Sequence, residues 1–283
     1  MHAPSDSPLG QRTVYTDRYD PALLFAIARA PQRQALGLAV NAPLPFTGAD
    51  QWGAYELSWR NARGKPQLAL ARFTIPCETP FLIESKSFKL YLGSFANSRF
   101  ADADVVQTTL RSDLQRALWG NEPPRAGLGL QLLLPDAFGA ERIAELDGIG
   151  LDRLDVACEH DAPAPELLRV DSSQPPVEEC LTSRLLKSNC PVTGQPDWAS
   201  VQVRYRGAPI NQEGLLQYIV SFRDHAGFHE DCVERIWLDV WQRCRPQQLT
   251  VYARYTRRGG LDINPLRTSS PGPMPEPVRH ARQ

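Results

Sequence analysis

In the C-terminal half of the chain, some segments alternate hydrophobic and polar residues, and others repeat hydrophobic residues at helical spacing. Alternation predicts half-buried strands, because successive side chains of a strand point to opposite faces. Recurrence every three or four residues predicts helices with one buried face. The predicted order is strand, strand, helix, helix, strand, strand, at 182–187, 200–206, 215–220, 233–244, 249–255 and after the turn at 257–260.

The N-terminal half repeats this order loosely. Its predicted strands lie at 54–60, 67–75 and 128–134, and its predicted helices begin near Ser87 and span 104–118. Hairpin connections and paired helices predict an α+β architecture, with antiparallel sheets that are each backed by two helices. A doubly wound parallel sheet would need single helices alternating with strands, and the pattern lacks that alternation.

Domain boundaries follow from changes in composition. A stretch rich in Pro, Asp and Glu separates the two halves, and both ends of the chain lack an apolar pattern, which is typical of flexible segments. We therefore expect a flexible N-terminus at 1–18, an N-terminal module at 19–158, a linker at 159–178, a C-terminal module at 179–267 and a flexible tail at 268–283.

Composition and charge exclude several classes of partner. Of the 283 residues, 42% are hydrophobic and 22% charged, as in a folded globular protein. The net charge is -1, so the basic excess that binds nucleic acid or an anionic membrane is absent. No apolar run approaches the roughly 18 residues of a membrane helix. The start of the chain does not resemble a secretory signal, and the six cysteines form no Cys-x-x-Cys pair. We expect a cytoplasmic protein with reduced thiols.

The common cofactor and hydrolase motifs are not found. Gly127-Leu128-Gly129 begins like a dinucleotide-binding loop, but Leu132 stands where the third glycine is required. There is also no Walker loop, His-Glu-x-x-His or Gly-x-Ser-x-Gly. The chemistry of this protein therefore has to be sought in less common segments.

One such segment is a Pro- and Gly-containing loop around Cys190, between two predicted strands. Asp197 follows seven residues later. A single cysteine is more often a small buried hydrophobic residue than a nucleophile. Its place in a loop, near a carboxylate, favours the nucleophile somewhat.

Two further segments lie at predicted helix starts. The run 84–89 has Glu and Ser residues that suit the first turn of a helix, together with two lysines that water can solvate. His229 and Glu230 begin a later helix, where acidic residues face the positive end of the helix dipole. The histidine could also donate a proton, and the glutamate could accept two N–H groups of a ligand. His225, His229 and Cys232 are spaced like metal ligands on one helix face.

Together these segments resemble the bimodular 7-cyano-7-deazaguanine reductases of queuosine biosynthesis. The likeness extends over most of the chain, at residues 44–46, 52–59, 84–89, 188–198, 228–230 and 255–265. Several long matches in the right order are far more specific than one short motif. The departures are Gly93, where the family pattern has asparagine, and the Pro-rich tail.

The resemblance implies a fold, a reaction and a set of site residues. The fold would be two tandem tunnelling-fold (T-fold) modules, closing in a homodimer. The reaction would reduce a nitrile to a primary amine with two NADPH and no metal. Cys190 would be the nucleophile, Asp197 the proton donor and His229 a further catalytic residue. The substrate would be held by Ile83, Glu84, Ser85, His229 and Glu230, and NADPH by Ser85, Lys86, Arg258 and Gly259.

The expected roles agree with elementary chemistry. A nitrile carbon is a weak electrophile, so addition of a thiolate prepares a C=N bond for hydride. The nitrogen then needs a proton, which requires Asp197 to be protonated near neutral pH and hence to have a raised pKa. Cys190 needs a lowered pKa, for which Lys187 or a helix end is the expected cause.

Two alternatives from other classes remain open at this point. A zinc-dependent, pterin-forming cyclohydrolase of the GTP cyclohydrolase type shares the expected fold, and would use His225, His229, Cys232 and Cys190 as ligands. However, an apolar helix stripe begins directly beside these residues. A non-catalytic partner protein would lack the loop Cys–Asp pair or the Glu-Ser-Lys run, and both are present.

Overall fold

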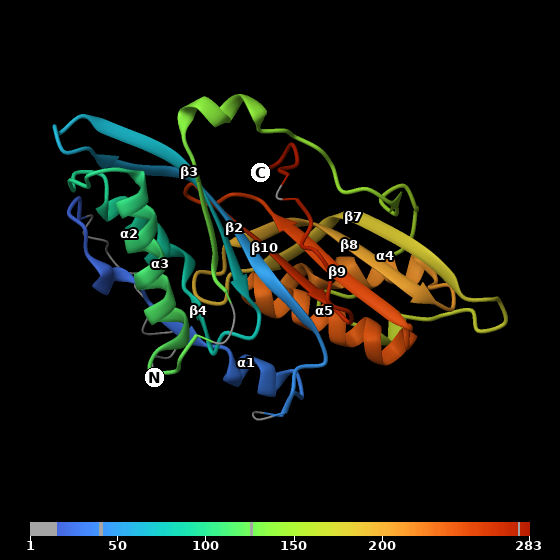
Figure 1. Cartoon of the computed structure of the whole chain (residues 1–283). Helices are drawn as coiled ribbons and strands as arrows, with labels where there is room; N and C mark the ends of the chain where they lie inside the picture. The colour runs from blue at the N-terminus through green and yellow to red at the C-terminus, as the bar shows by residue number, and fades with distance from the viewer. Residues whose placement is uncertain (1–15, 40–41, 125–126, 277) are drawn as a thin grey trace. The chain divides into compact units, whose positions relative to one another are not determined.

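The computed structural model describes residues 16–39, 42–124, 127–276 and 278–283 (Figure 1). The chain divides into two compact units. Unit 1 comprises the described residues of 1–42, 50–142 and 257–262, and unit 2 those of 43–49, 143–256 and 263–283.

Unit 2 contains the strand and helix order that the hydrophobic pattern predicts. In chain order its elements are β6 (Ile149–Gly150), η4 (Pro165–Leu167), β7 (Val177–Asn189), β8 (Pro196–Gly207), α4 (Gln212–Val220), η5 (Ser221–Asp224), α5 (His229–Cys244), β9 (Gln248–Tyr255) and β10 (Leu261–Thr268, from Ile263 onward). The strands are ordered β10-β9-β8-β7-β6 in the sheet. Their pairing is antiparallel except between β6 and β7.

The core of unit 2 lies between this sheet and the helices α4 and α5 (Figure 1). Val201 of β8 pairs with Ala253 of β9, and both are buried. From α5, Trp237 is fully buried and its indole N–H donates to the Leu249 carbonyl at 3.3 Å. Phe46 packs edge-on against the same indole ring. The period-2 pattern of the strands and the helical stripe of α5 therefore meet in one apolar layer.

Unit 1 has a similar composition of elements. They are η2 (Pro21–Leu23), β1 (Ala26–Ala28), α1 (Ala30–Ala35), β2 (Thr47–Arg60, from Asp50 onward), β3 (Pro66–Pro76), β4 (Phe81–Ile83), α2 (Ser85–Ser94), α3 (Ala103–Trp119), β5 (Gly129–Leu133) and η3 (Pro135–Ala140). Its strands are ordered β5-β3-β2, and β1 pairs separately with β4. The ring of Phe88, on α2, packs against Trp52 and Phe73 of the sheet. The expected α+β architecture with antiparallel sheets is confirmed in both units.

The expected boundaries between the modules differ from those of the structure. Residues 143–158, assigned by sequence to the N-terminal module, and the expected linker 159–178 both belong to unit 2. Within this segment Ala164 and Leu168 are buried. A few apolar residues in a Pro- and acid-rich stretch are enough to fix it on a neighbouring surface, although they form no periodic pattern.

The expected flexible tail, 268–283, is another difference. Thr268 is the last residue of β10, and His280 and Gln283 are only 1% and 7% exposed. Polar side chains hold this tail through hydrogen bonds, which a hydropathy pattern does not reveal. Of the expected flexible N-terminus 1–18, residues 1–15 lie outside the described residues. In the described parts of the chain, every helix is too short or too polar to cross a membrane.

Candidate active site

Cys190 and Asp197 lie at the two ends of the tight connection between β7 and β8. The Cys190 N–H donates to the Gln195 carbonyl, and the Gly194 N–H donates to the Cys190 carbonyl, both at 2.9 Å. Gly194 has φ +68, a left-handed conformation that glycine adopts without strain. Cys190 is 6% exposed and Asp197 4% exposed. The loop thus holds the thiol and the carboxyl side by side at one end of the hairpin.

His229 reaches the same place from α5. It is the first residue of that helix, and its Nε2 lies 3.5 Å from Asp197 Oδ2. The imidazole ring is stacked on the Tyr255 ring, with 3.9 Å between centroids and 25° between planes. Sheet register explains the arrangement, because Ser188 lies opposite Asp197 on β7 and Ala199 lies opposite Tyr255 on β9. An acid and an imidazole are therefore fixed together beside the loop cysteine.

A layer of buried hydroxyl and thiol groups lies beneath this pair. Ser188, Cys232 and Tyr255 are each fully buried. Burial raises the pKa of the Cys232 thiol to about 12, and the nearby carboxylates of Asp231 and Asp197 raise it further. Burial also raises the pKa of Tyr255, with Cys232 and Asp197 as additional causes. These groups stay protonated at neutral pH, so Cys232 is a poor nucleophile compared with a thiolate.

Glu230 is held in the first turn of α5, where it is 3% exposed. Phe228, the residue before this helix, gives it no side-chain cap. A carboxylate in this turn is stabilised by the positive end of the helix dipole. Lys187 was the expected cause of a lowered Cys190 pKa, but its ammonium donates to the Arg223 carbonyl, and it alternates with Ser188 along β7.

The residues proposed as zinc ligands do not form a metal site. Among the described residues, no group of three or more His, Cys, Asp and Glu side chains is arranged to hold a metal ion. Burial lowers the pKa of His225 to about 4, with Arg235 as a second cause. A Cβ at Gly227 would lie 3.0 Å from His225 Nε2, so the histidine packs closely against the loop before α5.

In unit 1, the segment 84–89 begins α2 as the helix-start interpretation predicts. Glu84 caps the helix: its Oε1 accepts from the Lys86 N–H at 2.8 Å and its Oε2 from the Ser87 N–H at 2.7 Å. The carboxyl is 1% exposed, and burial raises its pKa although these hydrogen bonds oppose the rise. Ile83 is buried at the end of β4. The expected substrate residues of this segment are thus rigidly placed by the start of one helix.

The structure also brings the expected cofactor residues together in unit 1. Arg258 and Leu261 close a turn in which Gly259 and Gly260 have φ +60 and +80. A Cβ on Gly259 would lie only 2.5 Å from Lys89 Nζ, so α2 lies directly against this turn. Ser85 and Lys86 occupy the first turn of the same helix. The residues present therefore fit the phosphate groups of a dinucleotide, which need cations and close approach to a main chain free of Cβ atoms.

Lys89 is a candidate that the sequence analysis did not assign. It lies one helical turn after Lys86, so both ammonium groups extend from the same side of α2. The i,i+3 spacing was the available signal, but lysines at a helix surface are usually only solvated.

Comparison with known proteins was made with family models and with curated relatives. A model described as "Nitrile reductase, 7-cyano-7-deazaguanine-reductase N-term" matches residues 15–121, and one described as "QueF-like protein" matches residues 196–272. A protein of Albidiferax ferrireducens is 63% identical over 291 residues and one of Verminephrobacter eiseniae 62% over 283 residues, with 100% of both chains covered in each case. One of Delftia acidovorans is 60% identical over 283 residues, again with 100% coverage. All three carry the name NADPH-dependent 7-cyano-7-deazaguanine reductase.

Among solved structures, the apo form of the archaeosine synthase QueF-Like is similar to part of the chain. The sequence identity is 20% and the TM-score 0.31, covering 35% of this chain and 99% of that one.

Proposed function

This chain belongs to the family of the NADPH-dependent 7-cyano-7-deazaguanine reductases, and we propose that Cys190, Asp197 and His229 carry out its chemistry. The enzyme reduces the nitrile of 7-cyano-7-deazaguanine to an aminomethyl group with NADPH, in queuosine biosynthesis. The observation that carries the proposal is the contact of Asp197 with His229 at the end of the Cys190 hairpin. Since the relatives are named as reductases, neither the zinc cyclohydrolase nor the non-catalytic partner is favoured.

The first step is a nucleophilic addition. The Cys190 thiolate attacks the nitrile carbon, so a C–S bond forms and one electron pair of the C≡N bond moves to nitrogen. Asp197 gives its proton to that nitrogen, and the product is a thioimide on Cys190. His229, 3.5 Å from the Asp197 carboxyl, orients that acid and can return a proton to it. When bound, NADPH supplies the hydride for each of the two reductions.

Substrate specificity is assigned to carboxylates. The 2-amino-4-oxo pyrimidine edge of a deazaguanine presents two adjacent N–H donors, which one carboxylate can accept together. Glu230 in unit 2 and Glu84 in unit 1 are both almost fully buried, so an unsatisfied partner would be costly in free energy. Ile83, Ser85 and His229 complete the proposed substrate residues.

NADPH is assigned to the start of α2 and the turn of Gly259. Ser85, Lys86, Arg258 and Gly259 are the proposed cofactor residues. Their support is the closeness of α2 to the turn, together with its positive charge. Arginine binds a phosphate through two forked donors and lysine through a point charge, so the pair suits the 2′-phosphate that distinguishes NADPH from NADH.

Three finer expectations also belong to this proposal. Each unit is proposed to be a tunnelling-fold module, which the strand, strand, helix, helix, strand, strand order of unit 2 supports. A homodimer and a cytoplasmic location stay predictions from the resemblance. The native mass in solution would test the first of them, and a dimeric mass is expected.

The proposed function is tested by forming the covalent intermediate without NADPH. Incubation with 7-cyano-7-deazaguanine alone should raise the intact mass of the protein by one substrate, because hydride is absent and the thioimide accumulates. Peptide mapping should place the label on Cys190. Cys190→Ala should give neither adduct nor turnover, yet still bind the substrate. Label on Cys232, or full activity of Cys190→Ala, would contradict the mechanism.

A further inference from the structure

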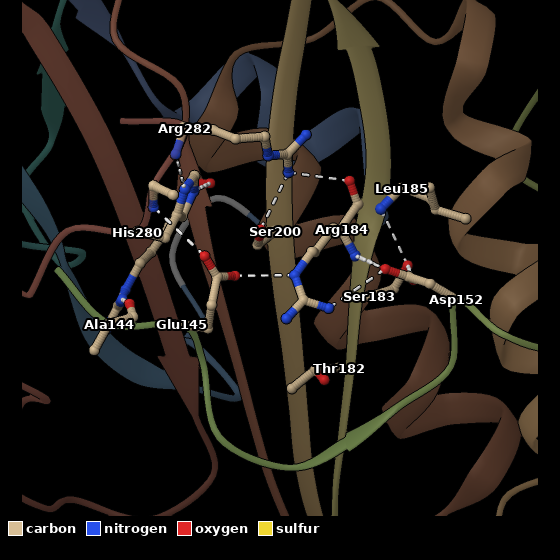
Figure 2. A network of polar contacts seen from close by, with 12 residues as sticks. Ala144, Glu145, Asp152, Thr182, Ser183, Arg184, Leu185, Ser200, His280 and Arg282 are labelled. Atoms are coloured by element: carbon tan, nitrogen blue, oxygen red, sulfur yellow. Dashed lines mark hydrogen bonds and ion pairs between the residues drawn. The ribbon is translucent and has the colours of Figure 1, made fainter.

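The segment Arg279–Gln283 is fastened across β7, β8 and β9 of unit 2 (Figure 2). Arg282 Nη2 donates to the Arg184 carbonyl at 3.0 Å and to Ser200 Oγ at 3.1 Å. Figure 2 shows these bonds beside the ion pair of Arg184 with Glu145, whose Nε–Oε2 distance is 2.9 Å. The segment is therefore a fixed part of the sheet surface.

Two buried side chains of this segment bond to the end of β9. His280 Nε2 lies 3.2 Å from the Arg254 carbonyl oxygen, and Gln283 Nε2 donates to the Tyr255 carbonyl at 2.9 Å. Gln283 Nε2 also donates to Asn264 Oδ1 at 2.7 Å. Two successive main-chain carbonyls, the last two of β9, are thus each bonded by this segment.

The His280 ring has one consistent protonation state. Its Nδ1 accepts from the Arg282 N–H at 3.1 Å, so Nε2 carries the hydrogen that is donated to Arg254. A neutral imidazole satisfies both bonds. The segment therefore closes on itself before it bonds to β9.

The pairing of β9 with β10 explains why this support matters. That ladder runs from Thr250–Thr268 to Tyr252–Leu266. At its end, β9 pairs with β8, where Tyr255 lies opposite Ala199. The Gln283 side chain holds the position of the Tyr255 main chain in addition to this pairing. Tyr255 is the residue whose ring lies against His229.

We propose that Gln283 is a positioning residue for the nitrile reduction. It fixes the Tyr255 main chain, so that the Tyr255 ring holds His229 within 3.5 Å of the Asp197 carboxyl. Gln283 touches neither Asp197 nor His229 in this chain of contacts and acts only through Tyr255. The inference rests on the proposed roles of Asp197 and His229.

A matched variant separates positioning from general stabilisation. Gln202, on β8 of the same unit, is also a buried glutamine, 8% exposed against 7% for Gln283. Its Nε2 likewise makes two hydrogen bonds, to the Asp147 carbonyl and to Asp147 Oδ1, both at 2.8 Å. Gln202→Ala should therefore lower the thermal midpoint about as much as Gln283→Ala, since both remove two bonds from a buried amide.

The readouts are kcat per folded enzyme and its pH profile. In Gln283→Ala, kcat should fall about tenfold, because His229 is no longer held against Asp197. The limb of the pH profile that belongs to the Asp197–His229 pair should shift. Gln202→Ala should leave both unchanged. In a Tyr255→Leu background, Gln283→Ala should give no further loss of kcat, because the two changes act through one ring.

Three results would overturn the inference: an unchanged kcat and pH profile in Gln283→Ala, equal effects of Gln202→Ala, or full additivity with Tyr255→Leu. Failure of the proposed function has a separate sign. If Asp197→Asn retains wild-type turnover, the catalytic assignment is wrong whatever Gln283 does. If Asp197→Asn is inactive and Gln283→Ala is unaffected, only the positioning role is wrong.

Discussion

The imidazole of His229 lies on the phenol ring of Tyr255, with ring centroids 3.9 Å apart. Stacking over an aromatic face fixes the plane of the imidazole and leaves its edge directed at a hydrogen-bonding partner. That partner is Asp197, whose Oδ2 is 3.5 Å from His229 Nε2. An acid that must deliver a proton at a defined point of the reaction gains from this arrangement, because neither group has to reorganise.

Asp197→Asn is expected to lower turnover by at least about a hundredfold, since the amide keeps the shape of the carboxyl but cannot donate the proton. Steady-state turnover and the thermal midpoint should be measured together. Asp152→Asn is the control, because Asp152 accepts bonds from Ser183 and Arg184 in the same unit, away from Cys190. Near-wild-type turnover of Asp197→Asn would transfer the acid role to another group, with His229 first.

Glu230→Ala is expected to weaken substrate binding by about 2–4 kcal/mol, the range for removing a charged partner of two buried hydrogen bonds. Titration calorimetry with 7-cyano-7-deazaguanine measures this directly. Asp231→Ala is the control, since Asp231 shares the first turn of α5 and its effect on the helix dipole. Equal losses in both variants would mean that charge at the helix start, and not a direct contact of Glu230, determines binding.

The sequence predicted the elements of this fold well because both kinds of periodicity are strong. The alternation at 200–206 and 249–255 corresponds to β8 and β9, and the stripe 233–244 corresponds to α5. Boundaries were predicted less well. Ala164 and Leu168 are buried in a segment whose composition indicates a linker, because burial there depends on a distant surface that no local pattern encodes.

The candidate site shows the same division. A loop cysteine near a carboxylate was visible in the sequence, whereas the stacking of His229 on Tyr255 joins residues 26 positions apart through tertiary structure alone. Gln283 could not be identified in advance either, since a glutamine in a Pro-rich tail carries no local signal. The proposed metal face 225–229–232 was plausible by spacing, but His225 precedes α5 and so does not follow the helical repeat.

Replacing both Lys86 and Arg258 by neutral residues is expected to narrow the preference for NADPH over NADH at least tenfold, about 1.4 kcal/mol. The ratio of kcat/KM for the two cofactors is the quantity to compare. Lys89→Ala should narrow it further, because its ammonium lies against Gly259. Lys65→Ala, an exposed lysine of unit 1, is the control. An unaffected ratio in the double variant would place the 2′-phosphate elsewhere.

Thiol labelling of the native protein should be selective. Burial raises the pKa of Cys232 to about 12 and that of Cys244 to about 11, so neither forms appreciable thiolate at pH 8. Cys158 is exposed and should be alkylated readily by iodoacetamide. Peptide mapping before and after denaturation should show Cys232 and Cys244 modified only in the unfolded chain. Labelling of Cys232 at the rate of Cys158 would show that the layer beneath Asp197 opens in solution.

Acidification should destabilise the protein partly through His225. Burial lowers the pKa of this imidazole from 6.5 to about 4, with Arg235 as the second cause, so the folded state holds it neutral while the unfolded chain protonates it. The unfolded state binds more protons below pH 6.5, and the stability that His225 contributes is therefore lost as the pH falls from 6.5 towards 4. His225→Gln cannot take up that proton, so its free energy of unfolding should fall less steeply over this range. Urea unfolding of both proteins at pH 7.0, 6.0 and 5.0, about the window in which the imidazole of an unfolded chain becomes charged, measures the two slopes. Parallel slopes would mean that His225 is protonated in the folded enzyme as readily as in the unfolded chain, and the packing of its ring against the loop of Gly227 would then have to be looser than the structure shows.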